Sequence, residues 1–206
     1  MRTRTKRMGR GGDRALSRRP HRREPRVKIT IFSEGAVTEP DYLGRFAAEV
    51  RVKLLFGKKG GKPADLVEAA IAARRATRSD GFSGDHEIWA VFDRDDHPHT
   101  PELRRRAAEN GVRVAFSEPC FEIWALLHRP DGLGPMTSRE AIERVCAHLP
   151  SYRREKRLDY DALRPHHDAA VARAERLRAA REQDGGTNPY TDVDVLLRLV
   201  RDNGKP

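Results

Sequence analysis

Hydrophobic runs and amphipathic segments alternate along residues 27–117 of the chain. Short runs rich in β-branched and aromatic residues predict buried strands, and apolar residues at helical spacing predict helices that turn one face toward a sheet. The expected strands are residues 27–33, 50–56, 87–92 and 112–117, and the expected helices between them are residues 38–50, 63–79 and 100–110. Strands that alternate with helices favour a parallel sheet with helices on its faces. We therefore predict an α/β fold with an about four-stranded, mostly parallel sheet.

The helix signals become denser toward the C-terminus. Thr38 is expected to cap the first helix, and residues 137–140, Thr-Ser-Arg-Glu, form a capping-box sequence. Pro119 opens a predicted helix over 121–128, residues 160–183 predict one long charged helix, and residues 188–191 start a final amphipathic helix. These patterns predict a core at residues 27–128 and a helical C-terminal extension, residues 129–206, that packs on it.

Acidic residues follow the ends of the predicted strands. Asp93 and Asp95 end the strand at 87–92, and their i, i+2 spacing points both side chains the same way. Two carboxylates held this close repel each other, so such a pair usually shares a cation. Glu34 ends the first strand, and the carboxyl ends of parallel strands meet at one edge of a sheet. The sequence therefore predicts a metal site at this edge.

Glu122 lies in the first turn of the helix that follows the last of these strands. Two interpretations are equally good: it contributes a further carboxylate to the predicted site, or it only complements the positive end of the helix dipole.

Most of the positive charge lies at the N-terminus. The net charge of the chain is +10, and residues 1–26 hold eleven Lys and Arg against two acidic residues. This segment has no apolar periodicity, so we expect a disordered basic arm. It either contacts phosphates, with Arg18, Arg19, Arg22 and Arg23 as candidates, or is an unselected leader.

A second basic segment, residues 57–62, has the sequence Gly-Lys-Lys-Gly-Gly-Lys. It lacks the Gly-Lys-Ser/Thr ending of a nucleotide-binding P-loop. The alternatives are a flexible loop that brings Lys58, Lys59 and Lys62 near nucleic acid, or a solvated connection. The second alternative needs no function.

The remaining bulk features are those of a cytoplasmic protein. The length of 206 residues suits one substantial domain, and two isolated cysteines, Cys120 and Cys146, do not form a disulfide framework. No stretch approaches the roughly 20 apolar residues of a membrane span, and the N-terminus lacks the apolar core of a signal peptide.

Glutamate at the end of one parallel strand and Asp-x-Asp at the end of another resemble the Toprim domain, a metal-dependent catalytic module. Four ordered motifs extend the resemblance to the RloB-like (AbiLii-like) family of bacterial restriction and abortive-infection loci. They are SEGAVTEPDY at residues 33–42, WAVFDRD at 89–95, SEPCFEIWALLH at 117–128 and NPYTDV at 188–193. Glu118 stands where the family usually has asparagine.

The resemblance implies roles for individual residues. Glu34, Asp93 and Asp95 are the expected catalytic residues and ligands of Mg²⁺, for which Mn²⁺ is an alternative. The expected contacts to these ligands or to the substrate are Thr38, Glu39, Asp96, Glu122 and His128. His97 and His99 are more simply interpreted as loop residues beside the site than as catalytic groups.

The resemblance implies a Mg²⁺-dependent endonuclease that acts in phage defence on DNA or RNA, including tRNA. An ATPase from the same locus is an expected partner, and a homodimer is a second expected assembly. One alternative is a non-catalytic, Toprim-like subunit that binds nucleic acid or the ATPase. Another is a primase-like nucleotidyl transferase, which the short chain disfavours.

Overall fold

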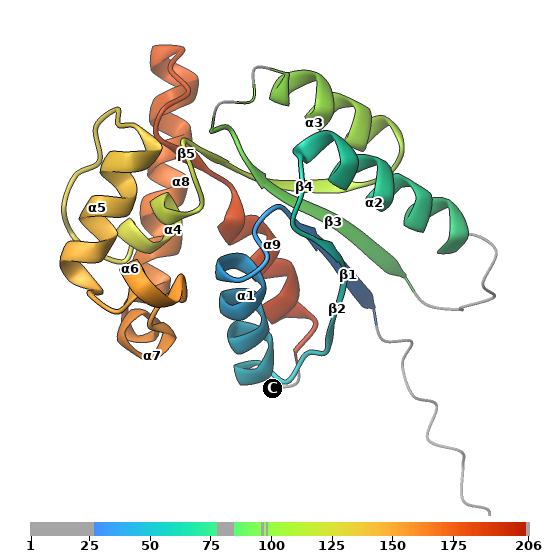
Figure 1. The fold of residues 1–206 in the computed structure, drawn as a ribbon, viewed down its shortest axis with the longest axis horizontal. Coiled ribbons are helices and arrows are strands. Elements are labelled where there is room, and N and C mark those ends of the chain that lie inside the picture. Colours follow the sequence, from blue (N-terminus) through green and yellow to red (C-terminus); the bar gives the residue numbers. More distant parts are fainter. Residues whose placement is uncertain (1–26, 78–84, 96, 98, 205–206) are drawn as a thin grey trace, which may run out of the picture.

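The computed structural model describes residues 27–77, 85–95, 97 and 99–204. Its centre is a five-stranded sheet in the order β2-β1-β3-β4-β5 (Figure 1). The strands are β1 (Lys28–Ser33), β2 (Leu54–Lys59), β3 (His86–Asp93), β4 (Arg113–Glu118) and β5 (Tyr190–Thr191). The first four are parallel, and β5 pairs antiparallel with β4. The predicted α/β fold with a mostly parallel sheet is confirmed, and it is consistent with a Toprim-like arrangement.

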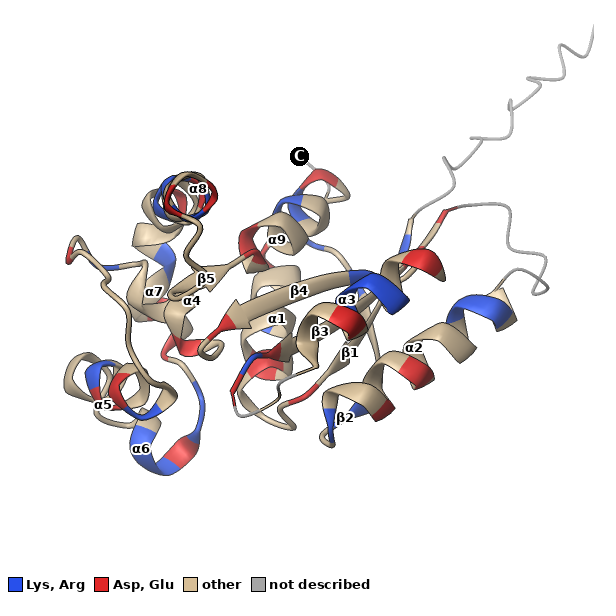
Figure 2. Cartoon of the chain, turned by 90° about the horizontal axis from the view of Figure 1, so that it is seen from above, with Lys and Arg blue, Asp and Glu red and all other residues tan. Residues whose placement is uncertain are grey.

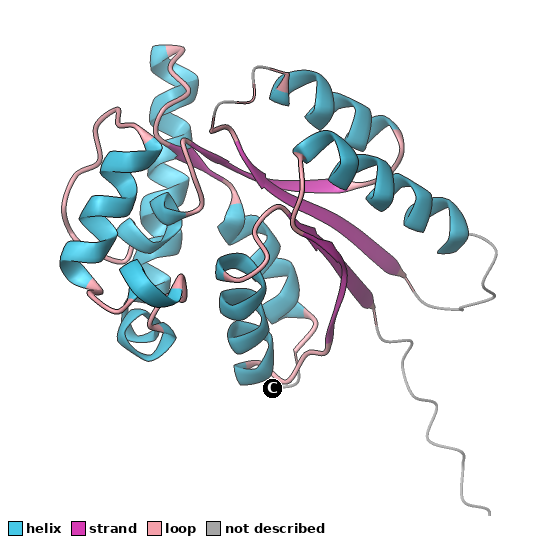
Figure 3. Ribbon diagram, in the orientation of Figure 1, coloured by secondary structure: helices cyan, strands magenta, loops and turns pink. Residues whose placement is uncertain are grey.

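Two helices cover each face of the sheet (Figure 3). Helices α1 (Thr38–Glu49) and α9 (Val193–Asp202) lie on one face, and α2 (Pro63–Thr77) and α3 (Thr100–Glu109) lie on the other. Side chains of β3 alternate between the two cores, with Trp89 and Val91 toward α1 and Ala90 and Phe92 toward α2. A strand buried on both faces is continuously apolar, which is the pattern that predicted β3.

The C-terminal part adds a helical layer next to the α1 face. It contains α4 (Glu122–Leu126), α5 (Ser138–His148), α6 (Tyr152–Glu155), α7 (Tyr160–Leu163), the 3₁₀ helix η1 (Arg164–His166) and α8 (His167–Asp184). The capping box is confirmed, since the Thr137 hydroxyl accepts from the Glu140 N–H and the Glu140 carboxylate accepts from the Thr137 N–H. In the described part of the chain, no helix has the length and apolar character of a membrane span.

Four predicted boundaries were wrong. The single helix at 160–183 breaks at η1, because Pro165 has no N–H to continue it. The second strand starts at Leu54, since Val52 N–H still bonds Ala47 O of the preceding helix. Residues 190–191 form β5 before α9 begins, because pairing with β4 overrides the local helical pattern. The helix after Pro119 begins only at Glu122, the third residue after that proline, and ends at Leu126.

Thr38 does not cap α1 as predicted. Val37 occupies the N-cap position without a side-chain cap, and Thr38 is the first helical residue. The Thr38 hydroxyl instead donates to Lys156 O at 2.8 Å and lies 3.4 Å from the Tyr152 hydroxyl. A contact more than a hundred residues away along the chain therefore replaces the local cap.

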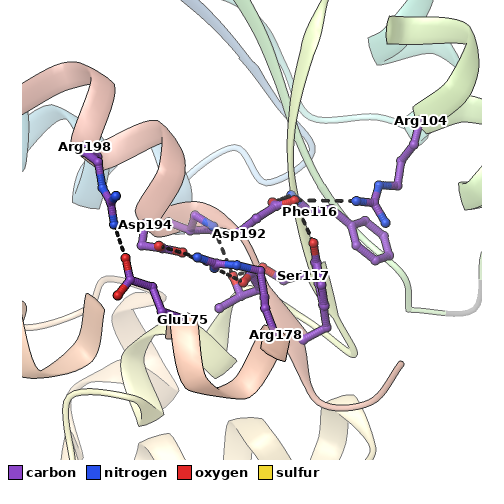
Figure 4. A network of polar contacts seen from close by, with 11 residues as sticks. Arg104, Phe116, Ser117, Glu175, Arg178, Asp192, Asp194 and Arg198 are labelled. Atoms are coloured by element: carbon purple, nitrogen blue, oxygen red, sulfur yellow. Dashed lines mark hydrogen bonds and ion pairs between the residues drawn. The ribbon is translucent and has the colours of Figure 1, made fainter. Parts of the chain in front are cut away.

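A buried polar network fixes β5 and α9 against β4 (Figure 4). Arg178 of α8 donates to both carboxylate oxygens of Asp194 and to Thr191 O. Asp192 accepts from the Phe116 N–H and lies 3.6 Å from Arg104, and the Ser117 and Thr191 hydroxyls lie 3.0 Å apart. The C-terminal segment is thus an integral part of the sheet.

Candidate active site

Carboxylates from four elements gather at the edge where β1 and β3 end. Glu34 follows β1, Asp93 ends β3, and Asp95 lies two residues beyond it. Glu39 comes from α1 and Glu122 from α4. These five acidic side chains line one cavity of about 420 Å³. The predicted convergence of acids at one sheet edge therefore includes two residues from helices.

Hydrogen bonds to neighbouring groups hold the carboxylates of Glu34 and Asp95 in place. Glu34 Oε2 accepts from the Asp93 N–H at 3.0 Å, and Glu34 Oε1 lies 3.3 Å from His97 Nε2. Asp95 has a positive φ of 32°, its N–H donates to Pro119 O, and its carboxylate accepts from the Ser138 hydroxyl at 2.6 Å. A non-glycine residue in this region is strained, and such strain clusters at functional sites.

Glu39 is buried and needs a glycine beside it. Its Oε1 accepts from the Gly35 N–H at 2.9 Å, and the side chain is only 4 % exposed. A Cβ at Gly35 would lie 1.9 Å from Glu39 Oε2, far inside van der Waals contact. Gly35 therefore lets the Glu39 carboxylate reach the cavity and rest on the backbone.

The acids perturb one another. Burial raises the pKa of Asp93 well above its usual value, and the charges of Glu39 and Glu122 raise it further. Burial likewise raises the pKa of Glu39 to about 7 and shifts the pKa of Glu34 upward, although the Asp93 N–H opposes the shift of Glu34. Carboxyl groups are therefore crowded here beyond what the neighbouring donors compensate, and full ionisation of all of them is disfavoured.

The donor chemistry of this cavity suits Mg²⁺, which prefers carboxylate and water oxygens. Glu34, Asp93 and Asp95 are the residues that would hold it. In the part of the chain that the structure describes, no three acidic, histidine or cysteine side chains converge as a ready ligand set. The carboxylates instead bind neighbouring donors: Asp95 binds Ser138, and Glu122 accepts from the Tyr152 hydroxyl. Metal binding would require these side chains to turn toward a common point.

A family model described as RloB-like protein matches residues 29–200. The chain belongs to the RloB-like family. Searches of curated proteins and of solved structures found no significant match.

The four motifs of this RloB-like chain occupy two places. The motifs at 33–42, 89–95 and 117–128 all contribute residues to the acidic cavity. The motif at 188–193 instead forms β5 and the Asp192 contacts to β4, so its described contacts are structural. One motif set thus serves both the site and the sheet that carries it.

Other predicted residues lie away from the cavity. His128 is buried in the core, where its ring nitrogens face Trp124 O at 2.9 Å and the Tyr42 hydroxyl at 3.4 Å. His99 is exposed just before α3. Asp96 and the arm residues lie outside the described residues; the arm residues are Arg18, Arg19, Arg22 and Arg23.

The basic segment at 57–62 lies at the edge of the sheet that holds the acids. Lys58 and Lys59 end β2, and Lys62 immediately precedes α2. The Gly60 N–H donates to Ser33 O at 2.9 Å, one residue before Glu34. The three lysines are near this edge but do not line the cavity.

Sequence patterns missed the three polar cavity residues that come from the C-terminal helices. Ser138, Tyr152 and Lys156 come from the helical part, more than forty residues beyond Asp93. Helical periodicity carries no sign of their role. The basic run Arg-Arg-Glu-Lys-Arg at 153–157 was the one available signal.

Proposed function

We propose that this chain is a Mg²⁺-dependent endonuclease that hydrolyses phosphodiester bonds of DNA or RNA in bacterial phage defence. The observation that carries the proposal is that Glu34, Asp93, Asp95, Glu39 and Glu122 all line one open cavity. Hydrolysis of a phosphodiester needs a cation beside the transferring phosphate, and a cluster of carboxylates is a means to hold one.

The residues divide the work. Bound Mg²⁺ would neutralise charge on the phosphate and lower the pKa of an attacking water. Asp93, on the rigid end of β3, and Asp95, held by Ser138, supply the ligands. Glu34 has a raised pKa and His97 within 3.3 Å, which suits it to accept a proton from the water. Glu39 and Glu122 support the negative charge that attracts the cation.

The biological setting rests on the family. Membership supports a role in defence and, by analogy, an ATPase partner, a homodimer and action in the cytoplasm. The arm at 1–26 and the segment at 57–62 supply positive charge to hold nucleic acid. Residues 27–128 are proposed as the catalytic core and 129–206 as its extension.

A second candidate is a non-catalytic subunit that binds nucleic acid or the partner. The observation in its favour is that the described carboxylates accept hydrogen bonds from protein groups and do not form a ready set of metal ligands. In that case the cavity serves regulation, and metal-dependent cleavage is absent.

The test is a cleavage assay with Mg²⁺ or Mn²⁺ on labelled plasmid, single-stranded DNA and total RNA. Glu34→Gln and Asp93→Asn keep the shape of each side chain and are expected to lower cleavage by about 100-fold or more. Asp131→Asn, an exposed carboxylate outside the cavity, is the matched control and should retain activity.

Two results separate the candidates. Cleavage that persists in both cavity variants would refute the assignment of the site. Binding without cleavage by the wild-type protein, with the partner ATPase present, would favour the non-catalytic subunit.

A further inference from the structure

Helix α6 and the turn after it form a basic rim at the acidic cavity. Tyr152 and Lys156 both line the cavity, and residues 153–157 add Arg153, Arg154 and Arg157. Figure 2 shows Lys and Arg colour along α6 and into the following turn. Among the described residues that line this cavity, Lys156 is the only Lys or Arg.

The backbone of Lys156 is fixed in an unusual conformation. Its φ of 53° and ψ of 27° are left-handed, a region that favours glycine because a Cβ is strained there. The Lys156 N–H donates to Tyr152 O at 2.9 Å, and Lys156 O accepts from the Thr38 hydroxyl at 2.8 Å. Contacts from α1 and α6 therefore hold the strained residue at the cavity.

The side chain of Lys156 is available for a ligand. Its Nζ lies 5.5 Å from the centre of the Tyr152 ring, and the side chain is exposed. The described structure shows no ion pair between Lys156 and a carboxylate, whereas neighbouring Arg157 pairs with Asp41 at 3.4 Å and Arg154 pairs with Glu155. The Tyr152 hydroxyl donates to Glu122, so Tyr152 contacts both the Lys156 ammonium and one of the cavity acids.

We propose that Lys156 contacts a backbone phosphate of the nucleic acid next to the phosphate that is cleaved, and that α6 guides the strand into the cavity. This inference rests on the proposed function and deepens it. A carboxylate cavity repels a polyanion, and a metal ion there compensates only the phosphate it touches. A neighbouring phosphate needs its own cation, and a lysine at the rim supplies one without reading the base sequence.

The experiment measures binding separately from cleavage. Fluorescence anisotropy follows labelled single strands and duplexes of RNA and DNA, with Ca²⁺ in place of Mg²⁺ so that bound substrate stays intact. Lys156→Met is expected to weaken binding several-fold and to reduce the slope of log affinity against log salt by slightly less than one, as for one lost phosphate contact. Lys156→Arg should retain most of the affinity. Lys53→Met removes an equally exposed lysine at the far end of β2 and should change neither quantity.

A second pair of variants distinguishes the effect of losing the Lys156 side chain from the effect of its left-handed backbone conformation. Lys156→Gly relieves the left-handed strain and should fold at least as stably as the wild type while binding as weakly as Lys156→Met. Arg51 has a similar φ of 59° but lies at the opposite edge of the sheet. Arg51→Gly should therefore keep full affinity.

The outcomes are distinct for the two proposals. Equal affinity and salt slope for wild type and Lys156→Met overturn the Lys156 contact, whether or not the wild type cleaves. No measurable binding by the wild type overturns it as well. Binding that depends on Lys156, together with no cleavage in Mg²⁺ when the partner ATPase is present, supports the contact and overturns the nuclease.

Discussion

Two groups of buried acids lie at the sheet, and they differ in whether a positively charged side chain pairs with them. In the network at β5, Asp194 is fully buried and is paired by Arg178 through two hydrogen bonds. In the cavity, Asp93 is almost as buried, but the neighbouring charges that act on it most strongly are the like charges of Glu39 and Glu122. The first group is neutralised by a cation of the protein, whereas the second places several carboxyl groups beside one another.

This difference separates a structural role from a functional one. A buried charge is tolerated when a partner and hydrogen bonds compensate its lost hydration. Proteins depart from that rule mainly at functional sites, where the compensating group arrives from outside. Asp192 and Asp194 therefore hold the C-terminal segment in place, whereas the uncompensated burial of Asp93 is what the proposed cation site would require.

The largest expected effect comes from breaking the network. Arg178→Met leaves Asp194 buried without its partner, which should lower the free energy of unfolding by about 3–5 kcal/mol. For a chain of this length, that corresponds to a decrease in Tm of about 10 °C. Differential scanning calorimetry or a thermal melt followed by circular dichroism measures it.

Two matched variants define the contrast. Arg198→Met breaks an exposed pair with Glu175, which should change stability by less than about 1 kcal/mol. Asp93→Asn removes a buried charge among like charges and should keep or raise Tm. A large loss of stability in Asp93→Asn would show that the cavity acids are structural like those of the network.

Two buried histidines differ from both groups of acids, because burial favours their neutral form. Burial lowers the pKa of His128 and of His167 to about 4, and the charge of Arg201 adds to the effect at His167. Because the unfolded chain binds these protons near pH 6.5, stability is full above that pH and is lost as the pH falls toward 4. The loss for His128 is on the order of 3 kcal/mol.

Denaturant titrations between pH 7 and pH 4 test this dependence. His167→Phe keeps the stacking on Phe46 and should flatten part of the slope. His148→Gln replaces an exposed histidine and should leave the slope unchanged. An equally steep slope in His167→Phe would contradict the neutral buried state.

The smallest expected effect is stabilisation of the folded protein by the proposed Mg²⁺. At a Mg²⁺ concentration ten times Kd, binding to the folded state alone adds about 1.4 kcal/mol and raises Tm by about 4 °C. Asp93→Asn should lose this increase, whereas Arg198→Met should keep it. Thermal melts with and without Mg²⁺ measure this increase. An equal increase in Tm for the wild type, Asp93→Asn and Arg198→Met would mean that the ion binds elsewhere.

Local sequence patterns predicted the parts of the fold that depend on neighbours along the chain. The apolar runs predicted β1, β3 and β4, and the capping box predicted the start of α5. Glu34, Asp93 and Asp95 were expected at one edge because parallel strands place their carboxyl ends together. Each of these inferences needs only strand or helix periodicity.

Features that depend on distant contacts were not predictable in this way. Thr38 has the residue type of a cap, yet its hydroxyl binds Lys156 O instead. Tyr190 and Thr191 follow a helical pattern, yet they pair with β4 because Asp192 and Thr191 bond to it. His128 was expected at the site because it belongs to the family motif at 117–128, but the chain turns it into the core.

The sequence alone determined a mostly parallel sheet with acids at the ends of β1 and β3, since residue spacing sets which side chains share a face and an edge. Only the tertiary structure decided that Ser138, Tyr152 and Lys156 complete the cavity. It also decided that Arg178 neutralises Asp194, whereas no described Lys or Arg pairs with Asp93. The reason is physical: whether a buried charge is compensated depends on groups brought within hydrogen-bond distance by packing, and spacing along the chain does not encode that distance.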